Sequence, residues 1–196
     1  AEVIDGTCYV IDHPEAEMDE ICQFIKGPDF PTGGVIMGRS GIRAAYATGR
    51  GKIKVRAKTE IVDLPNGKSQ IVITEIPYMV NKARLVESMA NLVKDKRIDG
   101  ITNIQDHSSR EGMQIVVDVR RDANAQVILN QLFTYSQLED TISMIHIALV
   151  PGAGGKLQPR VLTLRQILDQ YIGFQKDVVE RRTRFDLKKA RDRAHI

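Results

Sequence analysis

The chain has 196 residues, of which 42% are hydrophobic and 27% are charged. These values are typical of a globular protein, so they exclude wholesale disorder, and the length allows one or two domains with a sizeable core. The 28 Lys and Arg residues against 25 Asp and Glu give a net charge of +3. Because this charge is small, the positions of the cations indicate more about a partner than their sum does.

Cysteine usage and hydropathy indicate the compartment. Cys8 and Cys22 have no CxxC spacing, which predicts reduced core cysteines rather than a disulfide framework or a metal site. No apolar run approaches membrane length, and no signal-peptide pattern opens the chain. These features favour a cytoplasmic protein with no membrane partner. Helical patterns reach both ends of the chain without start or stop signals, so we expect a piece of a longer protein.

The first 51 residues predict three short helices, a turn and a short strand. Two helices, at 2–11 and 17–25, are expected to pack against each other. The inward face of the first is expected to consist of Val3, Ile4, Cys8 and Ile11. A turn rich in Pro and Gly at 27–34 then leads into a short buried strand at 35–37 and a small helix that ends at Gly49.

The middle of the chain predicts a sheet backed by two helices. Strands are predicted at 52–63, 69–76, 101–105, 113–119 and 141–150, and helices at 82–96 and 123–133. Asn66-Gly67 is a hairpin signal between the first two strands. From Ile71 to Val150 the order is strand, helix, strand, strand, helix, strand. This order predicts an α+β fold, with a split βαββαβ-like antiparallel sheet preceded by two short helices and a β-hairpin.

Inward faces are predicted for the last two helices. The helix at 123–133 is expected to bury Val127, Ile128, Leu132 and Phe133. After a short strand at 157–162, Thr163 caps a helix that continues to the end of the chain. An apolar seam should pack this helix on the domain through Leu164, Leu168, Tyr171 and Val178. Beyond Val179 the helix is strongly charged, so we expect this part to leave the domain.

A row of cations follows one face of the predicted strand at 52–63. Four of them alternate with apolar residues, namely Lys52, Lys54, Arg56 and Lys58. Because a period of two separates the faces of a strand, the row would extend over ~20 Å and could contact a phosphate backbone. The alternative is a solvated face whose lysines discourage edge pairing. Three arginines just upstream favour the phosphate interpretation: Arg39, Arg43 and Arg50.

The start of the predicted helix at 82–96 is a second cationic feature. Asn81 stands where an N-cap belongs, and Lys82 and Arg84 lie in the first turn. A helix start presents unpaired backbone N–H groups and partial positive charge, so it can hold a phosphate. The alternative is an ordinary capped helix with solvated cations.

No catalytic or metal site is predicted. The four histidines are scattered without ligand spacing, and no nucleophile with an adjacent base is evident. Glu139 is interpreted as a simple surface carboxylate. Aromatic residues make up 5% of the chain, too few for base-stacking platforms, so sequence-specific readout of bases is not indicated.

Seven motifs resemble one protein family. They are the segments 25–34, 38–41, 48–51, 75–78, 80–85, 99–101 and 181–196. Together they make the whole chain similar to the A subunits of the type IIA DNA topoisomerases, DNA gyrase and its paralogue topoisomerase IV. The resemblance implies that residues 1–30 are the helical end of a winged-helix region and 31–162 a tower domain. Residues 163–196 would be a long helix at the base of a coiled coil.

The resemblance also implies a function. The chain would be a DNA-binding scaffold that supports the gate duplex during ATP-dependent double-strand passage and supercoiling. The nucleophilic tyrosine of the family lies upstream of the matched segments. The fragment would therefore have no catalytic residue and be inactive alone, although the parent protein is an ATP-hydrolysing topoisomerase. An alternative is a protein–protein interaction or dimerisation module built on the terminal helix.

Partners and site residues follow from the same resemblance. The partners would be double-stranded DNA, the B subunit in an A2B2 heterotetramer and a second copy of the parent protein. The fragment would hold no cofactor, since magnesium and ATP belong to the B subunit. Asn81 and Lys82 match a family stretch that approaches DNA, whereas Met79 replaces its usual glutamine. The expected DNA-binding residues are Arg39, Arg43, Arg50, Lys52, Lys54, Arg56, Lys58, Asn81, Lys82 and Arg84.

Overall fold

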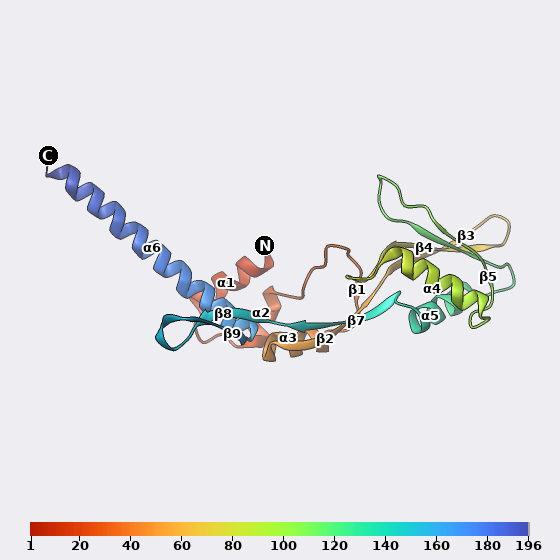
Figure 1. Cartoon of the computed structure of the whole chain (residues 1–196), viewed down its shortest axis with the longest axis horizontal. Helices are drawn as coiled ribbons and strands as arrows, with labels where there is room; N and C mark the ends of the chain where they lie inside the picture. Colours follow the sequence, from red (N-terminus) through yellow and green to blue (C-terminus); the bar gives the residue numbers. More distant parts are fainter. Residues whose placement is uncertain (196) are drawn as a thin grey trace. The chain divides into compact units, whose positions relative to one another are not determined.

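Residues 1–195 are described by a computed structural model, and they fall into two units (Figure 1). The first unit consists of residues 1–27, 40–51 and the chain from Ser143 onward, and the second of residues 28–39 and 52–142. The mixture of helices and antiparallel sheets confirms the predicted α+β class. Within the described residues, no helix combines the length and the apolar character needed to cross a membrane.

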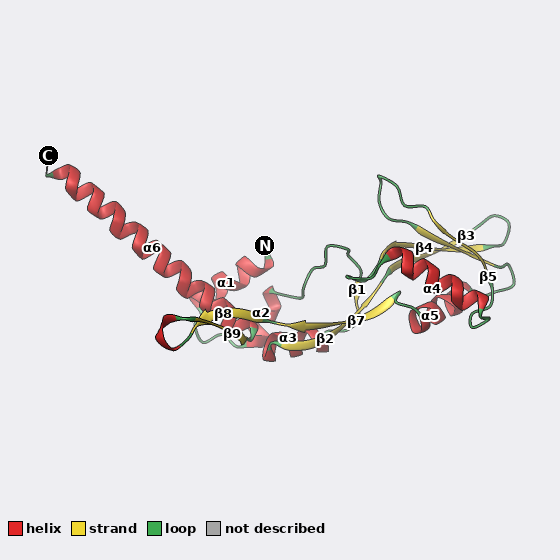
Figure 2. Ribbon diagram, in the orientation of Figure 1, coloured by secondary structure: helices red, strands yellow, loops and turns green. Residues whose placement is uncertain are grey.

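The second unit is built on a four-stranded antiparallel sheet in the order β3-β4-β6-β5. Figure 2 shows strands in yellow and helices in red. The strands of this sheet are β3 (Lys58–Asp63), β4 (Ser69–Glu75), β5 (Ile101–Asp106) and β6 (Ile115–Val119). Two helices, α4 (Lys82–Lys94) and α5 (Ala125–Tyr135), pack on it. Alternate residues of the strands and the apolar faces of the helices form one core. Its fully buried members include Ile71, Ile73, Met89, Leu132 and Leu138.

The fourth strand of this sheet is not the predicted one. A split βαβ unit would place the strand predicted at 141–150 beside β4. Instead, β3 pairs with β4 from Asp63 opposite Ser69 to Lys58 opposite Glu75. The turn containing Gly67, which has a φ of 79°, closes this hairpin. Because β3 occupies the position beside β4, the strand predicted at 141–150 pairs in other sheets. The order of the elements along the chain is as predicted.

The strand predicted at 52–63 is broken at Ala57. Its first part, β2 (Arg50–Arg56), belongs to a three-stranded sheet in the order β1-β2-β7, with β1 (Val35–Ile36) and β7 (Glu139–Ile145). The Ala57 N–H donates to the Leu138 carbonyl at 2.8 Å, and the register shifts where β3 begins. The strand predicted at 141–150 is likewise split, into β7 and β8.

Strand β1 is less buried than predicted. It lies at the edge of its sheet and pairs with β2, through Val35 opposite Arg56 and Ile36 opposite Val55. Val35 is therefore 48% exposed, and the prediction of a buried strand at 35–37 is wrong.

The first unit contains four helices and a hairpin. The helices are α1 (Glu2–Asp12), α2 (Met18–Phe24), α3 (Ser40–Thr48) and α6 (Leu164–Ala194). The hairpin pairs β8 (Ile147–Pro151) with β9 (Leu157–Val161), and the short 3₁₀ helix η1 (Ala153–Gly155) lies in its turn. Helices α1, α2 and α3 contact one another in sequence, and each contacts α6. The Thr163 side chain accepts from the Gln166 N–H at 3.2 Å, and Gln166 Oε1 accepts from the Thr163 N–H at 3.0 Å. This capping box confirms the predicted start of α6.

Helix α1 packs through a different face from the one predicted. Its buried residues are Gly6, Thr7 and Val10. A Cβ on Gly6 would lie 2.9 Å from the side chain of Ile25, so the missing side chain allows the close approach of α2. The predicted inward residues are all exposed, namely Val3, Ile4, Cys8 and Ile11. Cys8 is therefore not a core cysteine.

Two other helices bury most but not all of the expected residues. In α5, Ile128 and Leu132 are buried, but Val127 is exposed and Leu129 is buried in its place. In α6, Leu164 and Leu168 are buried and the charged half beyond Val179 is exposed, as predicted. Tyr171, expected in the apolar seam, is exposed.

Candidate nucleic-acid interface

The cation row lies on the exposed face of β2. Burial alternates along the strand, with Ile53 and Val55 buried and Lys52 and Lys54 exposed. The alternation arises because successive side chains of a strand point to opposite faces and one face meets apolar neighbours. It continues across the break into β3. Lys52, Lys54 and Lys58 are exposed and Arg56 is half-buried. The predicted alternation with buried apolar residues is therefore confirmed, although the four cations belong to two strands of different sheets.

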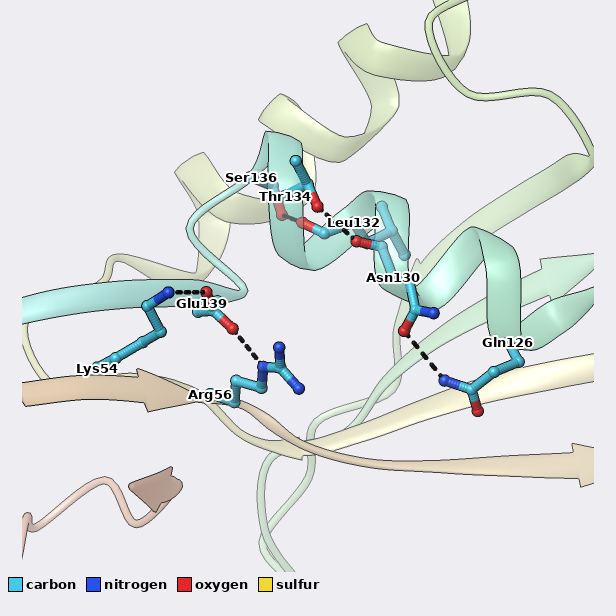
Figure 3. A network of polar contacts seen from close by, with 8 residues as sticks. All are labelled: Lys54, Arg56, Gln126, Asn130, Leu132, Thr134, Ser136 and Glu139. Atoms are coloured by element: carbon cyan, nitrogen blue, oxygen red, sulfur yellow. Dashed lines mark hydrogen bonds and ion pairs between the residues drawn. The ribbon is translucent and has the colours of Figure 1, made fainter. Parts of the chain in front are cut away.

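Two cations of the row are held by one carboxylate, as Figure 3 shows. Lys54 Nζ lies 3.3 Å from Glu139 Oε1, and Arg56 Nε donates to Glu139 Oε2. The Arg56 guanidinium also lies over the ring of Phe133, 4.7 Å from its centroid. The side chain of Glu139 is only 15% exposed, so its interpretation as a simple surface carboxylate is wrong.

A third cation of the row is also paired. Lys58 Nζ lies 3.8 Å from Glu75 Oε1, while Glu75 Oε2 accepts from the Gly34 N–H at 2.7 Å. A phosphate must therefore compete with a carboxylate for Lys54, Arg56 and Lys58.

The charge state of Glu139 links this cluster to stability. Burial tends to raise the pKa of Glu139, but the hydrogen bonds from Arg56 and Lys54 outweigh it and hold the pKa below the usual 4.5. A carboxyl group with a lowered pKa in the folded state stabilises the fold above its unfolded-state pKa. That contribution is lost as the pH falls through the lowered value.

Glu139→Gln is expected to lower the free energy of unfolding by about 1 kcal/mol at neutral pH, because two cations lose their charged partner. The loss should shrink below pH 4.5, where the wild-type carboxyl begins to be protonated. Denaturant unfolding of wild type and variant, at neutral pH and at a pH below 4.5, measures the change in the free energy of unfolding. Glu60→Gln is the control, since Glu60 is exposed on β3 and has no ion pair within residues 1–195. Equal losses in the two variants would contradict the role of Glu139.

The start of α4 combines a cap with an ion pair. Asn81 Oδ1 accepts from the Arg84 N–H at 3.1 Å, which confirms the predicted N-cap. Lys82 Nζ lies 2.8 Å from Asp106 Oδ2 at the end of β5. Met79, two residues before the cap, has a φ of 68° and is 84% exposed, so this turn presents an apolar side chain to solvent.

The predicted cations divide into two groups. The paired set contacts a carboxylate and consists of Lys54, Arg56, Lys58 and Lys82. The unpaired set is exposed and has no ion pair among the described residues; it consists of Arg39, Arg43, Arg50, Lys52 and Arg84. Because no described carboxylate neutralises its charges, the unpaired set is the better candidate for contact with phosphates.

The carboxylates that hold the paired set are not identifiable from the sequence. Glu139 lies 83 residues from Arg56 in the sequence, and Asp106 lies on a hairpin that follows α4. Neither pair has the short spacing that identifies helix or hairpin partners. In the described part of the chain, no group of three or more His, Cys, Asp or Glu side chains could hold a metal ion.

Comparisons with known proteins agree with the resemblance seen in the motifs. The family model of the DNA gyrase/topoisomerase IV A subunits matches residues 1–196. The chain is 60% identical over its whole length to a DNA gyrase A subunit from Clostridium acetobutylicum, and covers 23% of that protein. It is 50% identical to one from Granulibacter bethesdensis and 51% to one from Halalkalibacterium halodurans, covering 20% and 23% of them. The chain thus spans about a fifth of the length of these relatives.

Proposed function

Because the chain belongs to the family of DNA gyrase and topoisomerase IV A subunits, we propose that it supports the gate duplex of a type IIA topoisomerase. The observation that carries this proposal is the unpaired set, whose cations lie exposed on or beside regular secondary structure. Cations without a carboxylate partner can displace the counterions of a phosphate backbone, which is the main source of DNA affinity without sequence preference. Asn81 and the paired set, which includes Lys82, belong to the proposed surface as weaker contacts.

The parent protein is proposed to be an ATP-dependent DNA topoisomerase located in the cytoplasm. What supports this is that the similar proteins are DNA gyrase A subunits about four to five times as long as the chain. The winged-helix end at 1–30, the tower domain at 31–162 and the coiled-coil base at 163–196 are proposed on the same ground. The nucleophilic tyrosine is proposed to lie outside the chain, with magnesium and ATP on a B subunit in an A2B2 assembly. Sedimentation of the full-length parent with a B subunit tests that assembly, and separate peaks would contradict it.

The terminal helix supports a second proposal, that α6 pairs with another helix. Tyr171, Phe174 and Phe185 are exposed at a spacing that places them on one stripe of the helix. A long exposed helix gains stability when a partner covers such an apolar stripe. Sedimentation over a range of chain concentrations separates this function from DNA support, since a constant monomer mass would exclude pairing between copies.

Binding to unrelated duplexes tests the proposed DNA function. Two duplexes of equal length and unrelated sequence should bind the chain with affinities that agree within about threefold, because contacts to phosphate carry no sequence information. Fluorescence anisotropy at one salt concentration measures both affinities. A preference of about a hundredfold for one sequence would contradict a scaffold that contacts phosphates, and so would the absence of binding to either.

A further inference from the structure

Asp106 is held in place by its own hairpin. It ends β5, and its Oδ1 accepts from the Ser108 N–H at 2.9 Å and from the Ser108 hydroxyl. The Ser108 hydroxyl oxygen in turn accepts from the Gln114 N–H at 3.1 Å, on the other side of the turn. The carboxylate is therefore oriented by the β5–β6 hairpin and not only by Lys82.

The second oxygen of this carboxylate lies against Lys82. The Lys82 Nζ to Asp106 Oδ2 distance is 2.8 Å, and both side chains are about one-third exposed. The hydrogen bond from Lys82, with those from Ser108, lowers the pKa of Asp106 to about 2, so the carboxylate is charged at neutral pH. An anion that approaches the start of α4 thus meets an ammonium group that already has a fixed anionic partner.

Arg84 provides the comparison within the same helix turn. It is exposed, and no carboxylate pairs with it in the described residues. Lys82 and Arg84, both in the first turn of α4, therefore differ in how available they are to an anion. The difference arises because Asp106, on the β5–β6 hairpin, pairs with Lys82. Glu111 lies on that hairpin too, exposed and without an ion pair within residues 1–195.

We propose that Asp106 competes with DNA phosphate for Lys82 and so weakens the contribution of this lysine to duplex binding. This inference rests on the proposed function. Lys82 contributes little to the binding of a duplex while Asp106 holds it, and contributes as a full cation when the carboxylate is removed. Arg84 contributes equally in both cases. Asp106 thereby weakens the attraction between the start of α4 and a duplex. The attraction is restored only when a phosphate comes close enough to Lys82 to displace the carboxylate.

A double-mutant cycle in the full-length parent protein tests the competition. Asp106→Asn should tighten the binding of a duplex by ~3–5-fold, the range set by a partly exposed ion pair of up to about 1 kcal/mol. Lys82→Ala should then weaken binding by a factor that is ~3–5-fold larger in the Asp106→Asn background than in wild type. Arg84→Ala should cost the same in both backgrounds. Glu111→Gln removes the same charge from the hairpin and should change affinity by less than about twofold.

The results of this cycle distinguish a failure of the inference about Asp106 from a failure of the proposed DNA function. Equal costs of Lys82→Ala in the two backgrounds, or a larger cost in wild type, would overturn the competition. If Lys82→Ala has no effect in either background while the duplex still binds, the inference about Asp106 fails and the proposed function stands. Loss of duplex binding by every protein, wild type included, would overturn both. Melting temperatures check folding, and Asp106→Ser replaces Asp106→Asn in the cycle if the asparagine variant is unfolded.

Discussion

Replacing Arg50, Lys52 and Arg84 together by Ala is expected to weaken duplex binding by about 10- to 100-fold at low salt. Each of the three is exposed and lacks an ion pair within the described chain, so each substitution removes a cation available to a phosphate. A contact of about 0.5–1 kcal/mol for each residue gives this range. Stability should change by less than about 0.5 kcal/mol per substitution, because exposed side chains without partners contribute little to folding. Anisotropy and thermal melts measure the two quantities.

The matched control replaces Lys54, Arg56 and Lys58 by Ala. These three cations carry the same total charge and belong to the same row as Lys52, but Glu139 and Glu75 already hold them. Affinity should fall by less than about fivefold, since each is neutralised within the chain. The melting temperature should fall instead, because Glu139 is mostly buried and would lose both partners. If the control variant binds DNA as poorly as the Arg50, Lys52 and Arg84 triple variant, then pairing with a carboxylate does not decide which cations contact DNA.

Gly51→Ala is expected to lower the free energy of unfolding by about 3 kcal/mol or more. A Cβ at this position would lie 2.4 Å from the Gly41 carbonyl oxygen and 2.7 Å from the Ala45 backbone nitrogen. These are backbone atoms of α3, so the added methyl group can be accommodated only by moving the helix away from β2. For a chain of this length the loss corresponds to a melting temperature about 6–12 °C lower.

Gly173→Ala is the matched control for that substitution. Gly173 lies within α6, and a Cβ there would have open space around it, with no described atom within 4 Å beyond its chain neighbours and the backbone of its own helix. Alanine should therefore stabilise the helix by about 0.5–1 kcal/mol, because it lowers the entropy of the unfolded chain without a clash. A Gly51→Ala variant that melts with or above wild type would contradict the close approach of α3 and β2.

Much of the fold could be predicted because its signals are local. The Asn81 cap, the apolar face of α4 and the Asn66-Gly67 turn each depend on residues close in sequence, and all three occur. The charged half of α6 was predictable for the same reason. The fold class and the order of the elements follow from such signals, since each element is identified from its own residues.

The errors occurred where distant residues decide the structure. The fourth strand of the sheet depends on a competition between β3 and β7 for the edge of β4, which no single segment encodes. The buried face of α1 is set by the close approach that Gly6 allows, whereas hydrophobicity alone favoured Val3 and Ile4. In the candidate site, the row on β2 was visible in the sequence, but its pairing with Glu139 was not.

The salt dependence of duplex binding tests the central claim most directly. The affinity of wild type and of the Arg50, Lys52 and Arg84 triple variant would be measured from about 50 to about 200 mM salt. If unpaired cations bind phosphates, log affinity falls linearly with log salt for wild type, and the slope of the variant is smaller by roughly 0.9 for each cation removed. Equal slopes for the two proteins, or a wild-type affinity that does not change with salt, would contradict it.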